Sequence, residues 1–143
     1  MSFFMGIDPG YSGAVVVLDH KGGIVDCIRL SETEHDVSEF IAEYASDVTF
    51  AILEKVNAMP RQGVSSTFKF GTSYGFCRAL LVCHRIRFET TTPGMWQKTM
   101  GCMSKGDKKV TKAAAQRLFP EEKVVHATAD AMLIAEYARR KVV

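Results

Sequence analysis

The sequence predicts an α/β fold in which helices flank a five-stranded mixed sheet. Three short apolar, β-branched runs separated by turns fill the first 30 residues, which is typical of meandering strands. Helical and β-branched segments alternate from residue 33 onward, a pattern typical of sheets covered by helices. Hydrophobic residues make up 47% of the 143 residues and charged residues 24%, ordinary values that disfavour disorder and fibrous folds.

The first five elements follow from local patterns. Strands are expected at residues 2–9, 14–18 and 24–30, with turns between them. Apolar residues recur at helical spacing from Val37 to Tyr44, so we expect a helix capped by Ser31 or Thr33 that ends near Ser46. Residues 48–56 are apolar and β-branched, which indicates a buried fourth strand with Glu54 near its end.

The remaining elements are also expected from local signals. A helix is predicted over about residues 65–84, a strand over 85–91, and a short helix that opens at Pro93 and contains Trp96. A loop at 101–107 precedes helices at 108–119 and 127–141. No linker or repeat interrupts the chain, so residues 1–143 are predicted to form one domain.

The charge distribution and the cysteine content indicate which partners and which kinds of site to expect. Residues 1–54 carry two basic residues against ten acids, whereas residues 55–143 carry 16 against six, which indicates a polyanionic partner for the basic part. The four cysteines form no Cys-x-x-Cys pair, so reduced thiols are expected rather than zinc ligands or disulfides. No basic leader and no apolar run of ~18 residues is present, so we expect a soluble protein of the cytoplasm without a membrane partner.

Three acidic residues lie within or next to apolar segments, where burial of a charge costs free energy unless the charge is paired. Asp8 ends the first apolar run, Glu54 closes the fourth strand, and Asp130 lies in an alanine-rich helix. If the first and fourth strands are neighbours, Asp8 and Glu54 meet at one edge of the sheet. Asp130 can reach that point from a covering helix, with His126 one turn earlier on the same face. Such oxygen-rich sites suit Mg²⁺ or Mn²⁺, and paired ions can activate water for phosphodiester cleavage.

Each acid also has a structural alternative. Asp8 could belong to a turn with Pro9 and Gly10, Glu54 could pair with Lys55, and Asp130 could pair with a lysine or arginine. Their occurrence together in this order of elements favours a common site.

Three motifs follow one another along the chain: Gly6-Ile7-Asp8-Pro9-Gly10, Leu53-Glu54-Lys55-Val56 and His126-Ala127-Thr128-Ala129-Asp130-Ala131. In this order they resemble the motifs of the RuvC-type Holliday junction resolvases. The intervening segments are most similar to the compact RuvC-like nucleases of bacteriophages and some bacteria: Met59-Pro60-Arg61-Gln62-Gly63, Phe68-Lys69-Phe70-Gly71, and Thr92-Pro93 with Trp96. Sugar kinases and actin-like ATPases open with a motif like the first, but their folds duplicate this unit and 143 residues hold one copy.

The resemblance implies a ribonuclease H-like fold and a homodimer in which each subunit cuts one strand of a four-way junction. It also implies two Mg²⁺ or Mn²⁺ ions per active site. Asp8, Glu54 and Asp130 match the family's catalytic metal ligands. His126 is the candidate fourth ligand, at a place where many members carry another acid and some a histidine.

The basic residues are expected to contact DNA. Lys105, Lys108, Lys109 and Lys112 cluster at a helix start after a glycine-containing loop, which suits phosphate binding. In the family the segment after Glu54 faces the junction, and here it carries Arg61 and Lys69. Phe68 or Met59 could supply an apolar side chain that unstacks the junction, with a core position as the alternative for Phe68.

We therefore expect a metal-dependent, structure-selective endonuclease that resolves Holliday junctions and other branched DNA in a bacterium or a phage-infected host cell. Two alternatives remain open. One is an RNA–DNA hybrid nuclease of the same fold, and the other is a non-catalytic protein that binds junctions without cutting them.

Overall fold

The computed structural model describes residues 1–55 and 61–142 and confirms the α/β class with a five-stranded mixed sheet. The strands are β1 (Phe3–Asp8), β2 (Ala14–Leu18), β3 (Ile24–Arg29), β4 (Val48–Glu54) and β5 (Phe88–Thr91). The helices are α1 (Glu34–Tyr44), α2 (Val64–Cys83), α3 (Pro93–Thr99), α4 (Lys108–Leu118) and α5 (His126–Val142), with a 3₁₀ turn (Ala45–Asp47) after α1.

The element order is the predicted one, and the boundaries differ by a few residues. Thr33 caps α1, its hydroxyl accepting from the amide of Asp36. Strand β5 begins at Phe88, three residues later than expected, because Arg85 turns the chain after α2 with a φ of 56°. Val56, the last residue of the predicted fourth strand, lies outside the described residues.

The sheet has the strand order β3-β2-β1-β4-β5. Strand β1 runs antiparallel to β2 and parallel to β4, and β4 runs parallel to β5. Residues Ile7 and Leu53 are paired, so the carboxyl ends of β1 and β4 lie side by side. The prediction that Asp8 and Glu54 lie close together depends on this pairing of β1 with β4.

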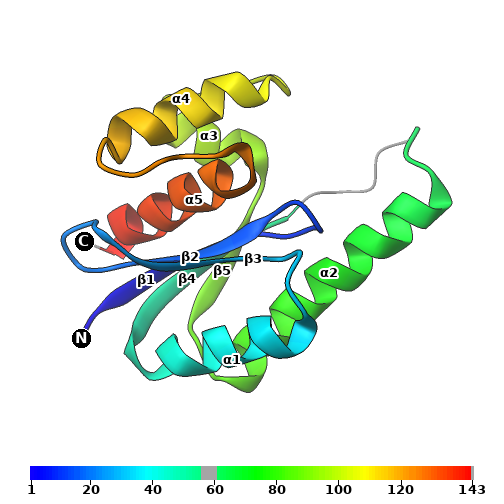
Figure 1. Cartoon of the computed structure of the whole chain (residues 1–143), viewed down its shortest axis with the longest axis horizontal. Coiled ribbons are helices and arrows are strands. Elements are labelled where there is room, and N and C mark those ends of the chain that lie inside the picture. Colours follow the sequence, from blue (N-terminus) through cyan, green and yellow to red (C-terminus); the bar gives the residue numbers. More distant parts are fainter. Residues whose placement is uncertain (56–60, 143) are drawn as a thin grey trace.

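Helices cover both faces of the sheet (Figure 1). On one face α3, α4 and α5 enclose a core that includes Phe50, Trp96 and Ile134, and on the other α1 and α2 pack over Met5, Ile7 and related side chains. Because side chains alternate along a strand, Asp8 and Glu54 project toward the α5 face, like Phe4 and Ile52 before them.

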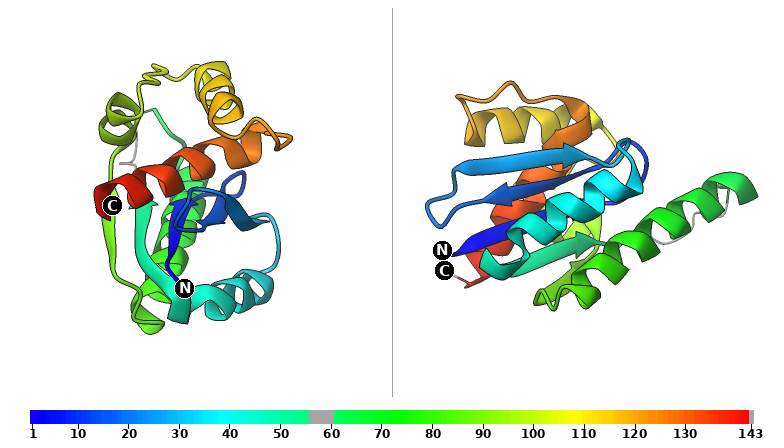
Figure 2. Two further views of the ribbon diagram at one scale, coloured as in Figure 1. Left: turned by 90° about the vertical axis from the view of Figure 1, so that its left-hand side faces the viewer. Right: turned by 60° about the horizontal axis from the view of Figure 1, so that its bottom comes forward.

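Helix α2 lies only partly on the sheet and extends beyond it (Figures 1 and 2). Within α2, which is described in full, Cys77 and Leu81 are the buried residues. Phe68 is 74% exposed, so its core assignment is wrong. A Cβ added at Gly71 or Gly75 would meet no described atom within 4 Å, so these glycines leave an open helix face.

Two further expectations concern the chain as a whole. All four cysteines are free, as predicted, and two of them, Cys77 and Cys102, are buried. Among the described residues, no helix combines the length and the apolar character that crossing a membrane requires.

Candidate functional site

Asp8 and Glu54 are neighbours at the carboxyl end of the parallel strands. Glu54 is 6% exposed and Asp8 is half-buried. The two side chains are near enough to interact: burial, then the charge of Glu54, raises the pKa of Asp8. The fold therefore places two carboxyl groups within contact at the point that the sequence predicted.

Helix α5 brings Asp130 to the same point. It packs so closely on β1 that a Cβ at Gly6 would collide with the backbone of Ala131 and Ala135. Asp130 lies one residue before this contact, and its charge raises the pKa of both Asp8 and Glu54. Gly6 is thus required for packing, because only a glycine lets α5 approach β1 this closely.

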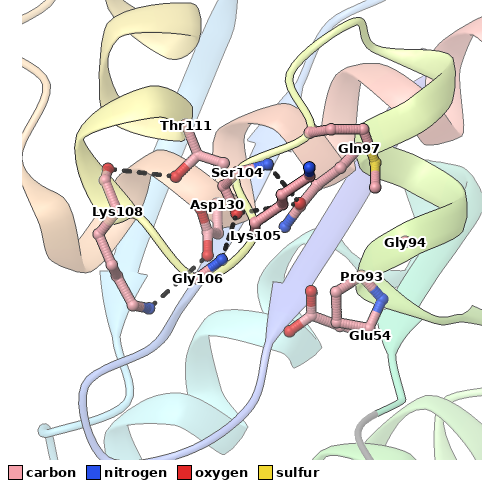
Figure 3. A pocket seen from close by; sticks show the side chains of 11 residues that line it. Glu54, Pro93, Gly94, Gln97, Ser104, Lys105, Gly106, Lys108, Thr111 and Asp130 are labelled. Carbon is pink, nitrogen blue, oxygen red and sulfur yellow. Dashed lines mark hydrogen bonds and ion pairs between the residues drawn. The ribbon is translucent and has the colours of Figure 1, made fainter.

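The three acids form an electrostatically unfavourable cluster. Burial, followed by the charges of Glu54 and Asp130, raises the pKa of Asp8 well above its usual value. Burial is also the main reason that the pKa of Glu54 is raised. Lys108, at the start of α4, opposes both shifts, and its Nζ lies 3.8 Å from Oδ2 of Asp130. Figure 3 shows this ion pair beside the Glu54 carboxylate.

Trp96 fixes the orientation of Glu54. Its indole Nε1–H donates a hydrogen bond of 2.6 Å to Oε2 of Glu54, and the Trp96 side chain is fully buried. This bond favours the ionised carboxylate and so lowers the pKa that burial raises. Beside Glu54 in the strand register, Thr91 has a buried hydroxyl oxygen with no hydrogen-bond partner among the described residues.

The donor set suits a hard divalent cation, although no complete cage is formed among the described residues. Carboxylate oxygens are the ligands that Mg²⁺ and Mn²⁺ prefer, and Asp8 and Glu54 present them side by side. Within the described ranges, however, no three His, Cys, Asp or Glu side chains are grouped closely enough to hold a metal ion. Asp130 faces the ammonium of Lys108 instead. A cation shared by all three acids would therefore take over the charge compensation that Lys108 supplies here.

His126 lies apart from this arrangement. It is the first residue of α5 and is exposed, one helical turn before Asp130. The structure does not join it with the carboxylates into a metal-binding group within the described ranges. Its role as a fourth ligand stays a prediction.

Two cavities adjoin the acids in the described part of the chain, and both are lined by Glu54 and Lys108. The smaller, about 370 Å³ and called here the lysine hollow, lies between α3, the 100–107 loop and α4 (Figure 3). The larger, about 790 Å³ and called the aromatic hollow, lies between the β1–β2 turn, the start of α1 and α2.

The predicted DNA-binding residues are distributed over these two cavities and their surroundings. Lys105 and Lys108 line the lysine hollow, and Phe68, Lys69 and Lys108 line the aromatic hollow. Lys109 is exposed and Lys112 half-buried on α4, and Arg61 is exposed before α2. Met59, the alternative to Phe68, lies outside the described residues.

Sequence reasoning missed the partners of two acids. The sequence analysis used Trp96 for the short helix and the resemblance and assigned it no partner. A buried indole N–H needs an acceptor, and this requirement could have linked Trp96 to a buried carboxylate. The sequence predicts a phosphate contact for Lys108, whereas here it pairs with Asp130, as one structural alternative for that acid allowed. The structural alternatives for the other two acids were a turn at Asp8 and an ion pair between Glu54 and Lys55. In the structure Asp8 and Glu54 instead interact with each other, and Glu54 accepts a hydrogen bond from Trp96.

Comparison with known proteins supports the fold. No family model and no curated protein matches the sequence. Among solved structures, the RuvC protein of Thermus thermophilus in complex with a Holliday junction substrate matches with a TM-score of 0.67 and 14% identity, over 94% of this chain and 90% of that one. A second structure of Thermus thermophilus RuvC matches with a TM-score of 0.60 and 15% identity, over 93% and 90%. The chain therefore has a RuvC-like, ribonuclease H-like fold, as predicted.

Proposed function

We propose that this protein is a metal-dependent endonuclease that cuts branched DNA, including Holliday junctions. The observation that carries the proposal is the convergence of Asp8, Glu54 and Asp130 at the end of two parallel strands, beside cavities lined by lysines. A structural neighbour is described as a RuvC in complex with a Holliday junction substrate, which supports branched DNA as the ligand.

The arrangement suits phosphodiester hydrolysis. Asp8 and Glu54 would hold a Mg²⁺ or Mn²⁺ ion, with Asp130, and His126 if it turns inward, as further ligands for a second. When bound, such ions supply an activated water and charge stabilisation for the leaving oxygen. Trp96 orients the Glu54 carboxylate and favours its ionised form against the effect of burial. Gly6 lets α5 lie close enough for Asp130 to reach the other acids.

DNA would be held mainly through its phosphates. Lys105, Lys108 and Lys109 stand on or beside the rim of the lysine hollow, where ammonium groups can pair with a strand backbone. Lys108 would exchange its partner Asp130 for phosphate once a cation neutralises the acids. Phe68, exposed on α2 and adjacent in sequence to Lys69, is the side chain proposed to enter the branch point. Arg61, exposed before α2, is proposed to contact DNA as well.

A homodimer is part of the proposal because two symmetric cuts need two active sites. Helix α2 supplies a suitable surface: Gly71, Gly75 and Ala79 are exposed at four-residue spacing on one side of it. Small residues at this spacing let two helices approach closely. Light scattering on the wild type and on Gly75→Glu should give a dimer and a monomer, respectively. A monomeric wild type would contradict this part of the proposal.

The proposal is tested by offering substrates side by side. An end-labelled four-way junction, a linear duplex and an RNA–DNA hybrid are incubated with the protein in Mg²⁺ or Mn²⁺, with EDTA as the control. We expect paired nicks in the junction that EDTA abolishes. Cutting of the hybrid alone would replace the proposal with a ribonuclease H activity. Tight junction binding without cutting in either metal would replace it with a binding protein.

A further inference from the structure

The hydroxyl of Thr91 is a buried donor without an acceptor. Thr91 ends β5 and is 6% exposed. In the described part of the chain, its Oγ1 is the one buried side-chain nitrogen or oxygen atom that has no hydrogen-bond partner. Burying a polar group without a partner costs free energy, so each such group in a folded protein needs an explanation. Thr91 is therefore a candidate for a role beyond packing.

Two other buried threonines show how the fold usually satisfies such a group. Thr111 is 2% exposed, and its hydroxyl donates a 3.3 Å hydrogen bond to the carbonyl of Lys108. Thr128 is 8% exposed, and its hydroxyl bonds in the same way to the carbonyl of Val125, also at 3.3 Å. Both lie in helices, where an earlier carbonyl is within reach. Thr91 lies in a strand, whose side chains stand roughly perpendicular to the sheet, so its acceptor must come from elsewhere.

The side chain paired with Thr91 across the sheet is that of Glu54. The two residues are partners in the parallel register of β4 and β5, so both side chains stand on the same face. An ionised carboxylate offers about four acceptor sites on its two oxygens, and Trp96 uses one of those on Oε2. Rotation about χ1 moves a threonine hydroxyl between staggered positions without a change in the backbone. An unused donor and unused acceptor sites are therefore neighbours at the ends of these strands.

Donors that orient Glu54 are what a cation site requires. A carboxylate that gives one oxygen to a divalent cation keeps acceptor sites on the other oxygen. Hydrogen bonds to those sites fix the direction of the carboxylate, and losing one typically lowers metal affinity by about 10- to 100-fold. Trp96 supplies one such bond from α3. Thr91, two residues before α3 begins, is placed to supply a second.

We propose that Thr91 is a positioning residue for Glu54: its hydroxyl donates a hydrogen bond to the Glu54 carboxylate when that carboxylate binds a divalent cation. Thr91 and Trp96 then hold Glu54 from two elements, β5 and α3. In EDTA the hydroxyl is unpaired and lowers the stability of the fold. This inference rests on the proposed function, because it assumes that Asp8 and Glu54 hold the cation, and it adds a residue that the sequence did not indicate.

The first measurement is thermal unfolding in EDTA. Thr91→Val replaces the hydroxyl with a methyl group and keeps the β-branched shape that suits a strand. Because the substitution removes an unpaired buried hydroxyl, it should raise Tm by about 2–8 °C. Thr111→Val is the matched control. It removes a buried hydroxyl that has a partner, so it should lower Tm instead.

The second measurement is calorimetric titration with Mn²⁺. Thr91→Val should raise the Kd for Mn²⁺ by about 10- to 100-fold, although it is the more stable protein. Thr91→Ser, which keeps the hydroxyl, should bind Mn²⁺ within about 3-fold of the wild type, and so should Thr111→Val. Asp8→Asn removes a proposed ligand and should weaken the same binding, which assigns it to this site. A purely structural role of Thr91 would not combine higher stability with lower cation affinity.

Two results would overturn the inference and leave the proposed function standing. One is a Thr91→Val protein that does not fold, or whose Tm in EDTA is no higher than that of the wild type. The hydroxyl would then already be satisfied, for example by a buried water. The other is a Thr91→Val protein that binds Mn²⁺ as tightly as the wild type. A wild type that binds no Mn²⁺ would overturn both the inference and the metal dependence of the proposed function.

Discussion

The hydrogen bond from Trp96 to Glu54 gives the sharpest prediction about the site. Trp96→Phe keeps an aromatic ring in the core and removes the indole N–H that lies 2.6 Å from Oε2 of Glu54. Hydrogen bonds to charged groups contribute about 1.5–3 kcal/mol. Losing this bond should therefore raise the pKa of Glu54 further, because the bond stabilises the ionised carboxylate.

The loss of the Trp96 hydrogen bond should also change how cleavage depends on pH. Burial raises the pKa of Glu54, and the Trp96 bond opposes burial. Without the bond, Glu54 ionises only at higher pH, so the acidic limb of the pH–rate profile should move to higher pH. The concentration of Mg²⁺ needed for half-maximal cleavage should rise as well, because the carboxylate is no longer held in one orientation.

The assay is junction nicking across a pH series and a Mg²⁺ series, with Phe119→Leu as the control. Phe119 is 7% exposed in the same core, and its substitution removes aromatic volume without removing a hydrogen bond. The control should lose stability and keep both the pH limb and the Mg²⁺ requirement. If Trp96→Phe and Phe119→Leu behave alike in both series, the positioning role of Trp96 is refuted.

Three other predictions follow from the cluster and its surroundings. Burial and the charges of Glu54 and Asp130 raise the pKa of Asp8, so its ionisation opposes folding as pH rises above about 3.9, the usual value for Asp. In EDTA at pH 7.5, Asp8→Asn should therefore be more stable than the wild type by ~0.5–2 kcal/mol, and at pH 3 the difference should vanish. Thermal or denaturant unfolding measures this difference, and equal stability at pH 7.5 would count against repulsion among the three acids. Lys108→Ala with Lys109→Ala should weaken binding to every branched DNA and reduce the slope of log K against log salt by up to ~2, and an unchanged slope would remove both lysines from the interface. Gly6→Ala should cost ~1–3 kcal/mol or more of stability, because its Cβ meets the α5 backbone; a silent Gly6→Ala would show that α5 can retreat from β1.

The part of the site that depends on strand order could be predicted from the sequence. Asp8 and Glu54 each end an apolar, β-branched run, and strands β1 and β4 are neighbours, so the two acids meet as expected. The same reasoning places Asp130 on the covering helix, since helical spacing fixes which side of α5 faces the sheet. These predictions required only the side-chain periodicity of each strand and helix and the assumption that the first and fourth strands are neighbours.

The contacts that tune the acids could not be predicted, because they depend on side-chain directions between elements far apart in the chain. Trp96 and Glu54 are separated by 42 residues, and no local pattern links them. The pairing of Lys108 with Asp130 depends on how α4 lies against α5. Phe68 is a large apolar residue of the kind that usually lies in a core, but α2 lies only partly on the sheet and the Phe68 ring is exposed.

The most direct test of the central claim compares Asp8→Asn with the wild type on one four-way junction, measuring binding in EDTA and nicking in Mg²⁺. The substitution removes a carboxylate from the cluster and also lessens the repulsion between the site and DNA. We predict that the variant binds the junction at least as tightly as the wild type and makes no paired nicks. Nicking by Asp8→Asn at the wild-type rate would contradict the assignment of these acids as the catalytic centre.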